Sequence, residues 1–265
     1  MSQRVDAKNI EQVNSKEMKD INPKEIMSFL KSKMPARFKM WLNICASCGL
    51  CADTCHYYLS SGKDPQMIPA HKVRFLKEIL KKKGKVDRGF LQKVYHTVYH
   101  ECNICRRCTM FCPFGIDIAL MISHLRSLLF SQGIAPEGLL TTIKDYNETG
   151  NQMAISKEDW VDTVEWCEEE TADELVGLKI PIDKKGAKIL YTVNAREPKF
   201  YPQDIMEVAK IFYVAGEDYT LPSKDGWDGT NLAMFCGDSK TARLIVENTF
   251  KRADELEVQQ VAVTE

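Results

Sequence analysis

The chain has 265 residues, and a hydrophobic content of 44% is enough to build one large or two small folded cores. Its 36 lysines and arginines balance 37 acidic residues, so the formal charge of -1 does not point to a nucleic-acid-binding protein. No apolar run approaches ~18 residues, and the polar start has no apolar signal core, so we expect neither a transmembrane helix nor a secreted protein.

The N-terminal region is predicted to have two parts. Residues 1–22 are polar and without periodicity, which indicates a flexible tail or a partner-binding arm. Pro23 then opens a short helix, on which Ile26, Phe29 and Leu30 share one face.

Eight of the ten cysteines form two runs with the same spacing, C-x-x-C-x-x-C-x-x-x-C. Three thiolates at this spacing can wrap a short loop around one four-iron cluster, and in two-cluster ferredoxins the last cysteine of each run binds the other cluster. The pattern therefore predicts two [4Fe-4S] clusters. The first would be held by Cys45, Cys48, Cys51 and Cys112, and the second by Cys102, Cys105, Cys108 and Cys55.

Two other kinds of site also use several cysteines, namely zinc sites and disulfide frameworks. Zinc sites use paired C-x-x-C elements but rarely four cysteines in one run, and disulfide frameworks suit short secreted chains. Pro113 follows Cys112, as the cluster pattern expects, whereas His56 follows Cys55, so the first run departs slightly from it. Because each run already supplies four thiolates, we expect His56 to pack beside Cys55 rather than to bind a cluster.

Helical periodicity fills the chain between the two runs and after them. Helices are predicted over 71–83 and from about 88 to 98, then over 118–129 and from 136 to about 150. Residues 23–150 are thus predicted to form an α-helical ferredoxin domain, not the small β-hairpin kind.

Residues 151–180 are acidic and contain Trp160 and Trp166. We interpret them as a linker or as a solvated helix, with a docking surface as the alternative.

The last segment, residues 181–265, alternates strands and helices. Strands are predicted over 187–193, 231–235 and 258–263, and helices over 202–213 and 239–256. Such alternation is typical of a small parallel α/β unit, so the fold class of the whole chain is α+β.

Two groups of basic residues lie near the cysteines. Arg106 and Arg107, inside the second run, either raise that cluster's reduction potential or face solvent. A basic cluster is either a solvated face or a guide for an acidic partner. It consists of Lys77, Lys81, Lys82, Lys83 and Lys85.

Two stretches carry a family resemblance. CASCGLCADTCHYYLSSGKDPQMIP, followed by a basic helix, and ECNICRRCTMFCPFGIDIALMISHLRSLL resemble the iron-sulfur half of the C and D components of heterodisulfide reductase. The catalytic iron-sulfur component of the membrane complex for dissimilatory sulfite reduction is similar too. The resemblance covers about residues 38–150 and continues more loosely through GWDGTN and MFCGD.

The resemblance also bears on the α/β unit. In longer relatives a cysteine-rich CCG domain of two such units binds a catalytic cluster through paired cysteines. Here only Cys167 and Cys236 lie outside the runs, and the chain stops where a further cysteine pair is expected. The unit therefore resembles a truncated, cysteine-less half of that domain and is expected to serve as an interaction domain. We expect no catalytic residue on this chain, and we expect Cys236 to be a small buried hydrophobic residue.

The family resemblance implies an electron-transfer subunit in a hetero-oligomeric heterodisulfide-reductase-like complex for sulfur-compound oxidation. It would relay electrons between a catalytic partner similar to the B component of heterodisulfide reductase and a flavin- and iron-sulfur-bearing partner similar to the A component. The alternatives are an iron-sulfur relay subunit of a respiratory dehydrogenase, of the anaerobic glycerol-3-phosphate or succinate type, that feeds quinone, and a zinc-stabilised interaction protein. Oxygen-labile clusters and abundant thiols predict a cytoplasmic location, or a peripheral one on the cytoplasmic side of a membrane complex.

Overall fold

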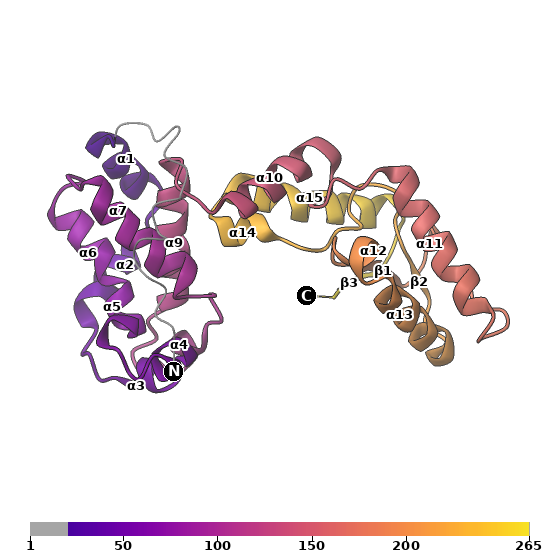
Figure 1. The fold of residues 1–265 in the computed structure, drawn as a ribbon, viewed down its shortest axis with the longest axis horizontal. Coiled ribbons are helices and arrows are strands. Elements are labelled where there is room, and N and C mark those ends of the chain that lie inside the picture. The colour runs from indigo at the N-terminus through magenta and orange to yellow at the C-terminus, as the bar shows by residue number, and fades with distance from the viewer. Residues whose placement is uncertain (1–20, 265) are drawn as a thin grey trace. The chain divides into compact units, whose positions relative to one another are not determined.

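The computed structural model describes residues 21–264, which divide into two compact units (Figure 1). The first unit runs to residue 137 and includes the short segment 235–238, and the second holds the rest. Residues 1–20, most of the predicted tail, lie outside the described residues. The last two residues of that predicted tail are structured: Ile21 packs against the first core, and the Asn22 side chain accepts a hydrogen bond from the Lys24 amide, 3.0 Å.

The first unit is helical. Its elements are α1 (Pro23–Lys33), α2 (Ala36–Ile44), α3 (Leu50–Asp53), α4 (His56–Ser60), η2 (Pro65–Met67), α5 (Pro69–Lys72), α6 (Arg74–Lys81), α7 (Arg88–Tyr95), η3 (His96–His100), α8 (Arg107–Met110) and α9 (Ile118–Ser131).

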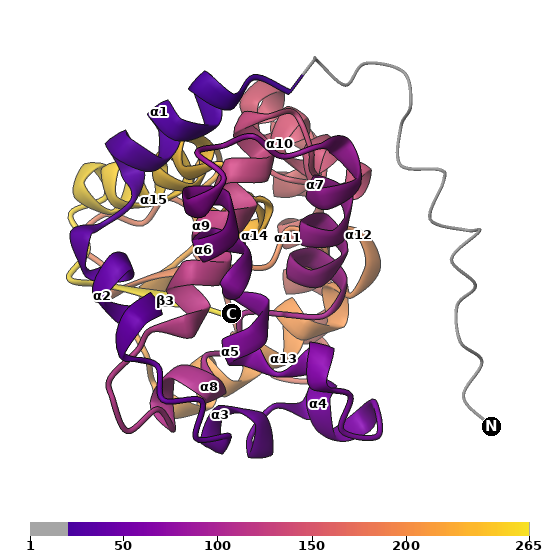
Figure 2. The same ribbon diagram turned by 90° about the vertical axis from the view of Figure 1, so that its left-hand side faces the viewer.

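Helix α9 lies at the centre of this unit, in contact with α1, α5, α7 and α8 (Figure 2). Apolar residues occur on more than one face of α9 and are buried, as expected for a helix surrounded by other helices. Asp117 begins it by accepting a hydrogen bond from the Leu120 amide, 2.9 Å. A helix this enclosed gives the loops before it a fixed support.

The segment 235–238 packs within the first unit although it is distant in sequence. The Tyr99 hydroxyl donates to the carbonyl of Cys236, 2.6 Å, and Arg126 Nη1 donates to the carbonyl of Phe235, 2.9 Å. Gly237 allows this close approach, because a Cβ there would lie 2.6 Å from the backbone of Arg126.

The second unit is mixed. Its elements are α10 (Glu137–Thr149), α11 (Lys157–Ala172), β1 (Ile189–Thr192), α12 (Glu197–Phe200), α13 (Pro202–Ala215), β2 (Tyr219–Thr220), α14 (Leu232–Cys236), α15 (Ser239–Glu255) and β3 (Gln260–Val263), with the first residue of α10 and the end of α14 belonging to the first unit.

The three strands form a parallel sheet in the order β2-β1-β3. Alternate residues of β1 face opposite sides: Leu190 packs with Ala253 of α15 and with Leu256 just after it, whereas Tyr191 belongs to the core formed with α11 and α13. Helices therefore cover both faces of the sheet, as expected for a small parallel α/β unit. This confirms the mixed fold class.

Two sequence predictions for this unit need correction. Residues 231–235 were expected to form a strand, but the structure has helix α14 there, with Asn231 Oδ1 accepting from the Met234 amide, 3.2 Å. Residues 151–180, interpreted as a linker or a solvated helix, contain helix α11, but its Trp160 is fully buried and stacks on Trp227 at 4.5 Å between ring centroids. Helix α11 thus belongs to the core of the second unit.

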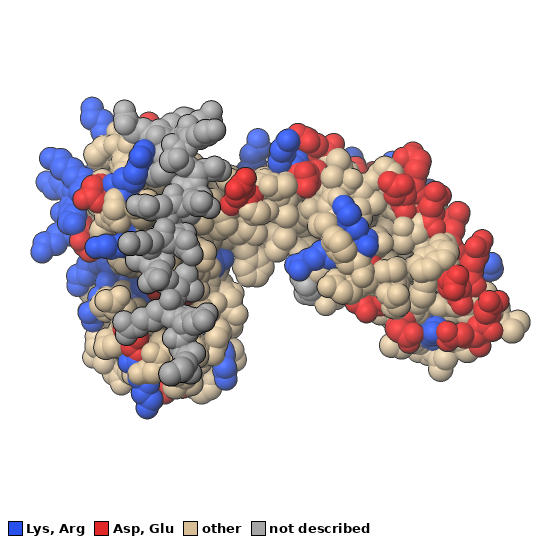
Figure 3. Space-filling model, in the orientation of Figure 1, with Lys and Arg blue, Asp and Glu red and all other residues tan. Residues whose placement is uncertain are grey.

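Charge is distributed unevenly over each unit (Figure 3). Lysines and arginines gather on the side of the first unit that carries α6, and acidic residues follow α11 in the second. The predicted basic cluster around α6 is exposed to solvent, which agrees with a solvated face.

Candidate iron-sulfur sites

The two cysteine runs fold into loops of the same conformation. Ser47 and Ile104, each the second residue after the first cysteine of its run, have φ of 54° and 57°. Gly49 and Arg106, each following the second cysteine, have φ of 87° and 64°. A short helix, α3 or α8, then begins at the equivalent residue of each loop. Left-handed backbone at non-glycine residues costs free energy and clusters at ligand sites, so the shared strain indicates a shared role.

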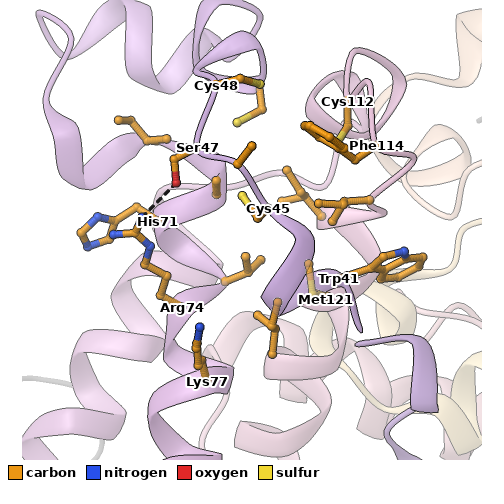
Figure 4. A pocket seen from close by; sticks show the side chains of 18 of the residues that line it. Trp41, Cys45, Ser47, Cys48, His71, Arg74, Lys77, Cys112, Phe114 and Met121 are labelled. Carbon is orange, nitrogen blue, oxygen red and sulfur yellow. Dashed lines mark hydrogen bonds between the residues drawn. The ribbon is translucent and has the colours of Figure 1, made fainter. Parts of the chain in front are cut away.

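The first site is a cavity of about 750 Å³ lined by four cysteines (Figure 4). They are Cys45, Cys48, Cys51 and Cys112, the set that the sequence assigned to the first cluster. Helix α6 contributes Arg74 and Lys77 to the wall, and Arg74 Nη2 donates to Ser47 Oγ, 3.3 Å. The donor set and the volume both fit a four-iron cluster.

The second site is a smaller cavity, also lined by four cysteines. They are Cys55, Cys102, Cys105 and Cys108, the set assigned to the second cluster. Its volume is about 30 Å³, roughly the share of one water molecule in the liquid. The four thiolate donors match those of a four-iron cluster, the enclosed space is smaller than at the first site, and Cys105 of this set is exposed.

The two sites adjoin each other. Ile118 at the start of α9 lines both cavities, and α3 packs against α8. The Cys51 and Cys108 thiols are close enough that their charges interact. Neighbouring sites of this kind suit groups that exchange electrons.

Burial controls the ionisation of the site thiols. Burial raises the pKa of Cys108 to about 12, with a further rise from the neighbouring thiols Cys102 and Cys51. Burial likewise raises the pKa of Cys51, and its three partners in the first site add to the rise. The thiols become stable thiolates only with a positive group among them, which the irons of a cluster supply.

Two sulfurs accept main-chain hydrogen bonds. The Ile104 amide donates to Cys102 Sγ, 3.4 Å, and the backbone of Ala70, in α5, hydrogen-bonds the Cys51 thiol. Hydrogen bonds to sulfur are one of the means by which a protein sets a cluster's potential. Ala70 lies far from either run in sequence, so cysteine spacing gave no sign of it.

Arg106 and Arg107 line the second cavity but are exposed to solvent, which was one of the two alternatives expected from the sequence. Arg106 also forms an ion pair with Asp117, 2.9 Å. Lys72 and Arg126 were not singled out from the sequence, yet they are 2% and 3% exposed and lie beside Cys102. A signal existed for Arg126, which is the one lysine, arginine or acidic residue within α9.

Residues outside the two sets lie near them without joining them. His56 lines the second cavity, and its ring packs on Tyr57 at 4.5 Å between centroids. Cys167 and Cys236 are buried in different units, and burial raises the pKa of Cys236 to about 12. Cys236 is thus the buried small side chain that the sequence predicted.

Residues 21–264 hold neither a ready-made site for a single metal ion nor a membrane span. No group of three or more His, Cys, Asp or Glu side chains there is arranged to hold such an ion. No helix in the same range is long and apolar enough to cross a membrane.

Comparison with known proteins gives one matching family and several relatives. The family is the 4Fe-4S dicluster domain, which matches residues 41–116. The Hdr-like menaquinol oxidoreductase iron-sulfur subunit 2 of Archaeoglobus fulgidus is 28% identical over 83% of this chain and 43% of its own length. The Hdr-like menaquinol oxidoreductase iron-sulfur subunit of Archaeoglobus profundus is 27% identical over 84% and 43%.

A further relative is the D component of the dihydromethanophenazine:CoB--CoM heterodisulfide reductase of Methanosarcina mazei, 29% identical over 37% of this chain and 26% of its own length. The chain spans less than half the length of these curated relatives. No solved structure matches it. The family resemblance stated from the sequence is confirmed: residues 41–116 match the 4Fe-4S dicluster domain, and the chain is similar to proteins named as iron-sulfur subunits of Hdr-like menaquinol oxidoreductases and as the D component of heterodisulfide reductase.

Proposed function

We propose that this chain is an electron-transfer subunit with two [4Fe-4S] clusters. Cys45, Cys48, Cys51 and Cys112 would hold the first cluster, and Cys102, Cys105, Cys108 and Cys55 the second. The observation that carries the proposal is the grouping of the eight cysteines around two adjoining cavities, four to each, with the last cysteine of each run in the other run's set. A cluster held in this way takes up or gives up one electron at a time.

The chain's own residues support and tune such groups. The two loops share left-handed residues at equivalent positions, and α8, which packs against both α3 and α9, supports them. The amide of Ile104 and the backbone of Ala70 stabilise negative charge on sulfur. No proton transfer is required, since only electrons pass between the sites.

We further propose that the chain works in a heterodisulfide-reductase-like complex on the cytoplasmic side. A catalytic partner similar to the B component of heterodisulfide reductase would carry the active site. This chain would relay electrons between that partner and a flavoprotein similar to the A component. The α/β unit, as half of a CCG-like domain, would serve in assembly. Two relatives are named as iron-sulfur subunits of menaquinol oxidoreductases, which favours a quinol-linked complex as the alternative to sulfur-compound oxidation.

Single cysteine substitutions test the ligand sets. Anaerobically purified protein is expected to be brown, with about eight irons and eight sulfides per chain from two cubes. C45A and C112A should each remove the same electron paramagnetic resonance signal, because they belong to one set. C55A and C102A should both remove the other signal.

The buried Cys236 offers the matched control, since C236A removes a thiol outside both sets. It should leave iron content and both signals unchanged. A colourless protein that contains zinc would refute the proposed function. If C45A and C112A instead abolished different signals, the exchange of fourth ligands would be wrong while the electron-transfer function could stand.

The choice between the two complexes is tested by co-expression with candidate partner proteins. Reduction of the assembled complex by a water-soluble menaquinol analogue would support the quinol-linked alternative. If the same clusters are reduced only through the catalytic partner with its sulfur substrate, the sulfur-oxidation proposal is supported instead.

A further inference from the structure

Two cations are buried in the first unit beside the second site. Lys72, the last residue of α5, is 2% exposed, and Arg126 of α9 is 3% exposed. Lysine and arginine are almost never fully buried unless a counter-charge accompanies them, because an ionised group loses its hydration there. Each of the two buried cations is therefore expected to have a negatively charged group nearby.

Among residues 21–264, the ion pairs found include neither of these two cations. The Lys72 ammonium donates to the carbonyl of Glu101 and lies 5.1 Å from the centroid of the Tyr57 ring. The Glu101 carboxylate is directed elsewhere, to His96 at 3.0 Å. Carbonyl oxygens and a ring face are partial negative charges only, so the ammonium keeps an unneutralised charge.

Arg126, like Lys72, is held by main-chain carbonyls and the face of an aromatic ring. Its Nη2 donates to the carbonyls of Cys102, 2.6 Å, and Val98, 2.8 Å, and its Nη1 to that of Phe235, 2.9 Å. The guanidinium also lies over the Tyr99 ring at 5.1 Å. Four main-chain hydrogen bonds, counting the one from Nε to Val98, fix the position of its charge.

Both cations converge on one ligand residue. Lys72 is bound to the carbonyl just before Cys102, and Arg126 to the carbonyl of Cys102 itself. Lys72 also lines the second cavity. Arg106 lines this cavity too, but it is exposed and paired with Asp117, so solvent screens its charge.

We infer that Lys72 and Arg126 are positioning residues whose charges compensate the second cluster and raise its reduction potential. This inference rests on the proposed function. A cluster at this site would take one electron from its donor on reduction, and the charges of the two buried cations would stabilise the negative charge added there.

The test compares midpoint potentials of the full-length, cluster-loaded protein by redox titration with electron paramagnetic resonance detection. K72M removes the charge and keeps an apolar chain of similar length, and R126Q keeps hydrogen-bond donors for the carbonyls. Each should lower the reduced-to-oxidised ratio of the second cluster about tenfold at a fixed poise, or about 59 mV for a one-electron couple. The signal lost in C102A identifies this cluster.

Two controls separate charge from structure. K72R retains the positive charge and should restore most of the potential, which a purely structural role would not require. K93M removes an exposed lysine of α7 that lines neither cavity and should leave the second midpoint unchanged.

The outcomes distinguish the inference from the proposed function. If both clusters are present and K72M leaves the second midpoint within error of the wild-type value, the inference is wrong although the proposed function stands. If K72R shifts the midpoint as far as K72M, position rather than charge is responsible and the inference is again wrong. If the wild-type protein binds no clusters, the proposed function itself fails. Should R126Q not fold, the lysine series decides alone.

Discussion

At the residue scale, His124 links the pH of the solution to the packing of α1, α2 and α9. Its Nε2 lies 2.7 Å from the carbonyl of Lys33, and its ring meets that of Phe38 edge-on at 4.9 Å between centroids. Burial lowers the pKa of His124 below its ordinary 6.5, although the Lys33 carbonyl opposes this. The neutral imidazole is thus the form that the fold prefers.

This preference predicts that acid weakens the first unit. The unfolded chain binds a proton at His124 near pH 6.5, whereas the folded chain does so only at lower pH, so the free energy of unfolding falls as pH drops from about 7 through 6. Urea denaturation at several pH values measures the slope. H124Q keeps a donor for the Lys33 carbonyl without titrating, and its stability should fall less over this range. Equal slopes in the two proteins would contradict the assignment.

Residue-level prediction from sequence is most specific where spacing carries the information. The spacing of the eight cysteines predicts two sets of ligands, and the same two sets line the two cavities, while cluster binding by them stays a prediction. Lys72 and Arg126 could not be found in this way, because their place beside Cys102 depends on how α5 and α9 pack. Their hydrogen-bond partners are main-chain carbonyls. Because every residue has one, these partners leave no signal in the sequence.

At the element scale, helix α11 shows how composition can mislead. Its acidic face suggested a linker, yet Trp160, Val164 and Cys167 recur on one side and are buried in the second core. Trp160 Nε1 also donates to the carbonyl of Pro222, 2.8 Å. The helix is therefore expected to stabilise the second unit.

Substitution of the two tryptophans of α11 tests this role. W160A should cost about 3–5 kcal/mol of unfolding free energy, because it removes a large buried ring and its stacking on Trp227. W166A is the control on the same helix, since Trp166 is 42% exposed, and it should change stability by less than about 1 kcal/mol. Chemical denaturation followed by circular dichroism gives both values. Similar small losses would mean that α11 contributes little to the core.

Among the other elements, the long helices were predicted from the sequence and several short elements were not. The long periodic helices α9, α13 and α15 were predicted close to their observed bounds. The apolar run 231–235 was too short for its period to separate strand from helix, and its capping residue Asn231 was the better signal. The strand β2, with two residues, carries no local pattern and exists only through its pairing with β1.

At the scale of the whole molecule, the near-zero net charge conceals a separation of charge between the units. Basic residues surround α6 and acidic ones follow α11 (Figure 3). The chain also leaves the second unit at 235–238 to pack within the first before α15 begins. The units are therefore joined by three crossings of the chain, not by one linker.

Gly237 is the residue on which the return segment depends. Its φ is +95°, and a Cβ would lie 2.6 Å from the Ser127 amide nitrogen, so G237A should destabilise the first unit by at least about 2 kcal/mol. G186A is the matched control, because Gly186 has φ +70° with no atom within 4 Å, and it should cost only about 1 kcal/mol of backbone strain. Limited proteolysis should also cut G237A sooner between α14 and α15. If the two variants behave alike, the contact of segment 235–238 with α9 is unimportant.

The exchange of the fourth cysteine between the two loops has a consequence for biogenesis. Under the proposed ligation, Cys55 and Cys112 each complete the site of the opposite loop, so neither loop can finish its own cofactor. Insertion at one site would fix three cysteines of one loop and the last cysteine of the other, and would thereby order the ligands of the neighbouring site. Loading then becomes cooperative, and half-filled protein should be scarce during maturation.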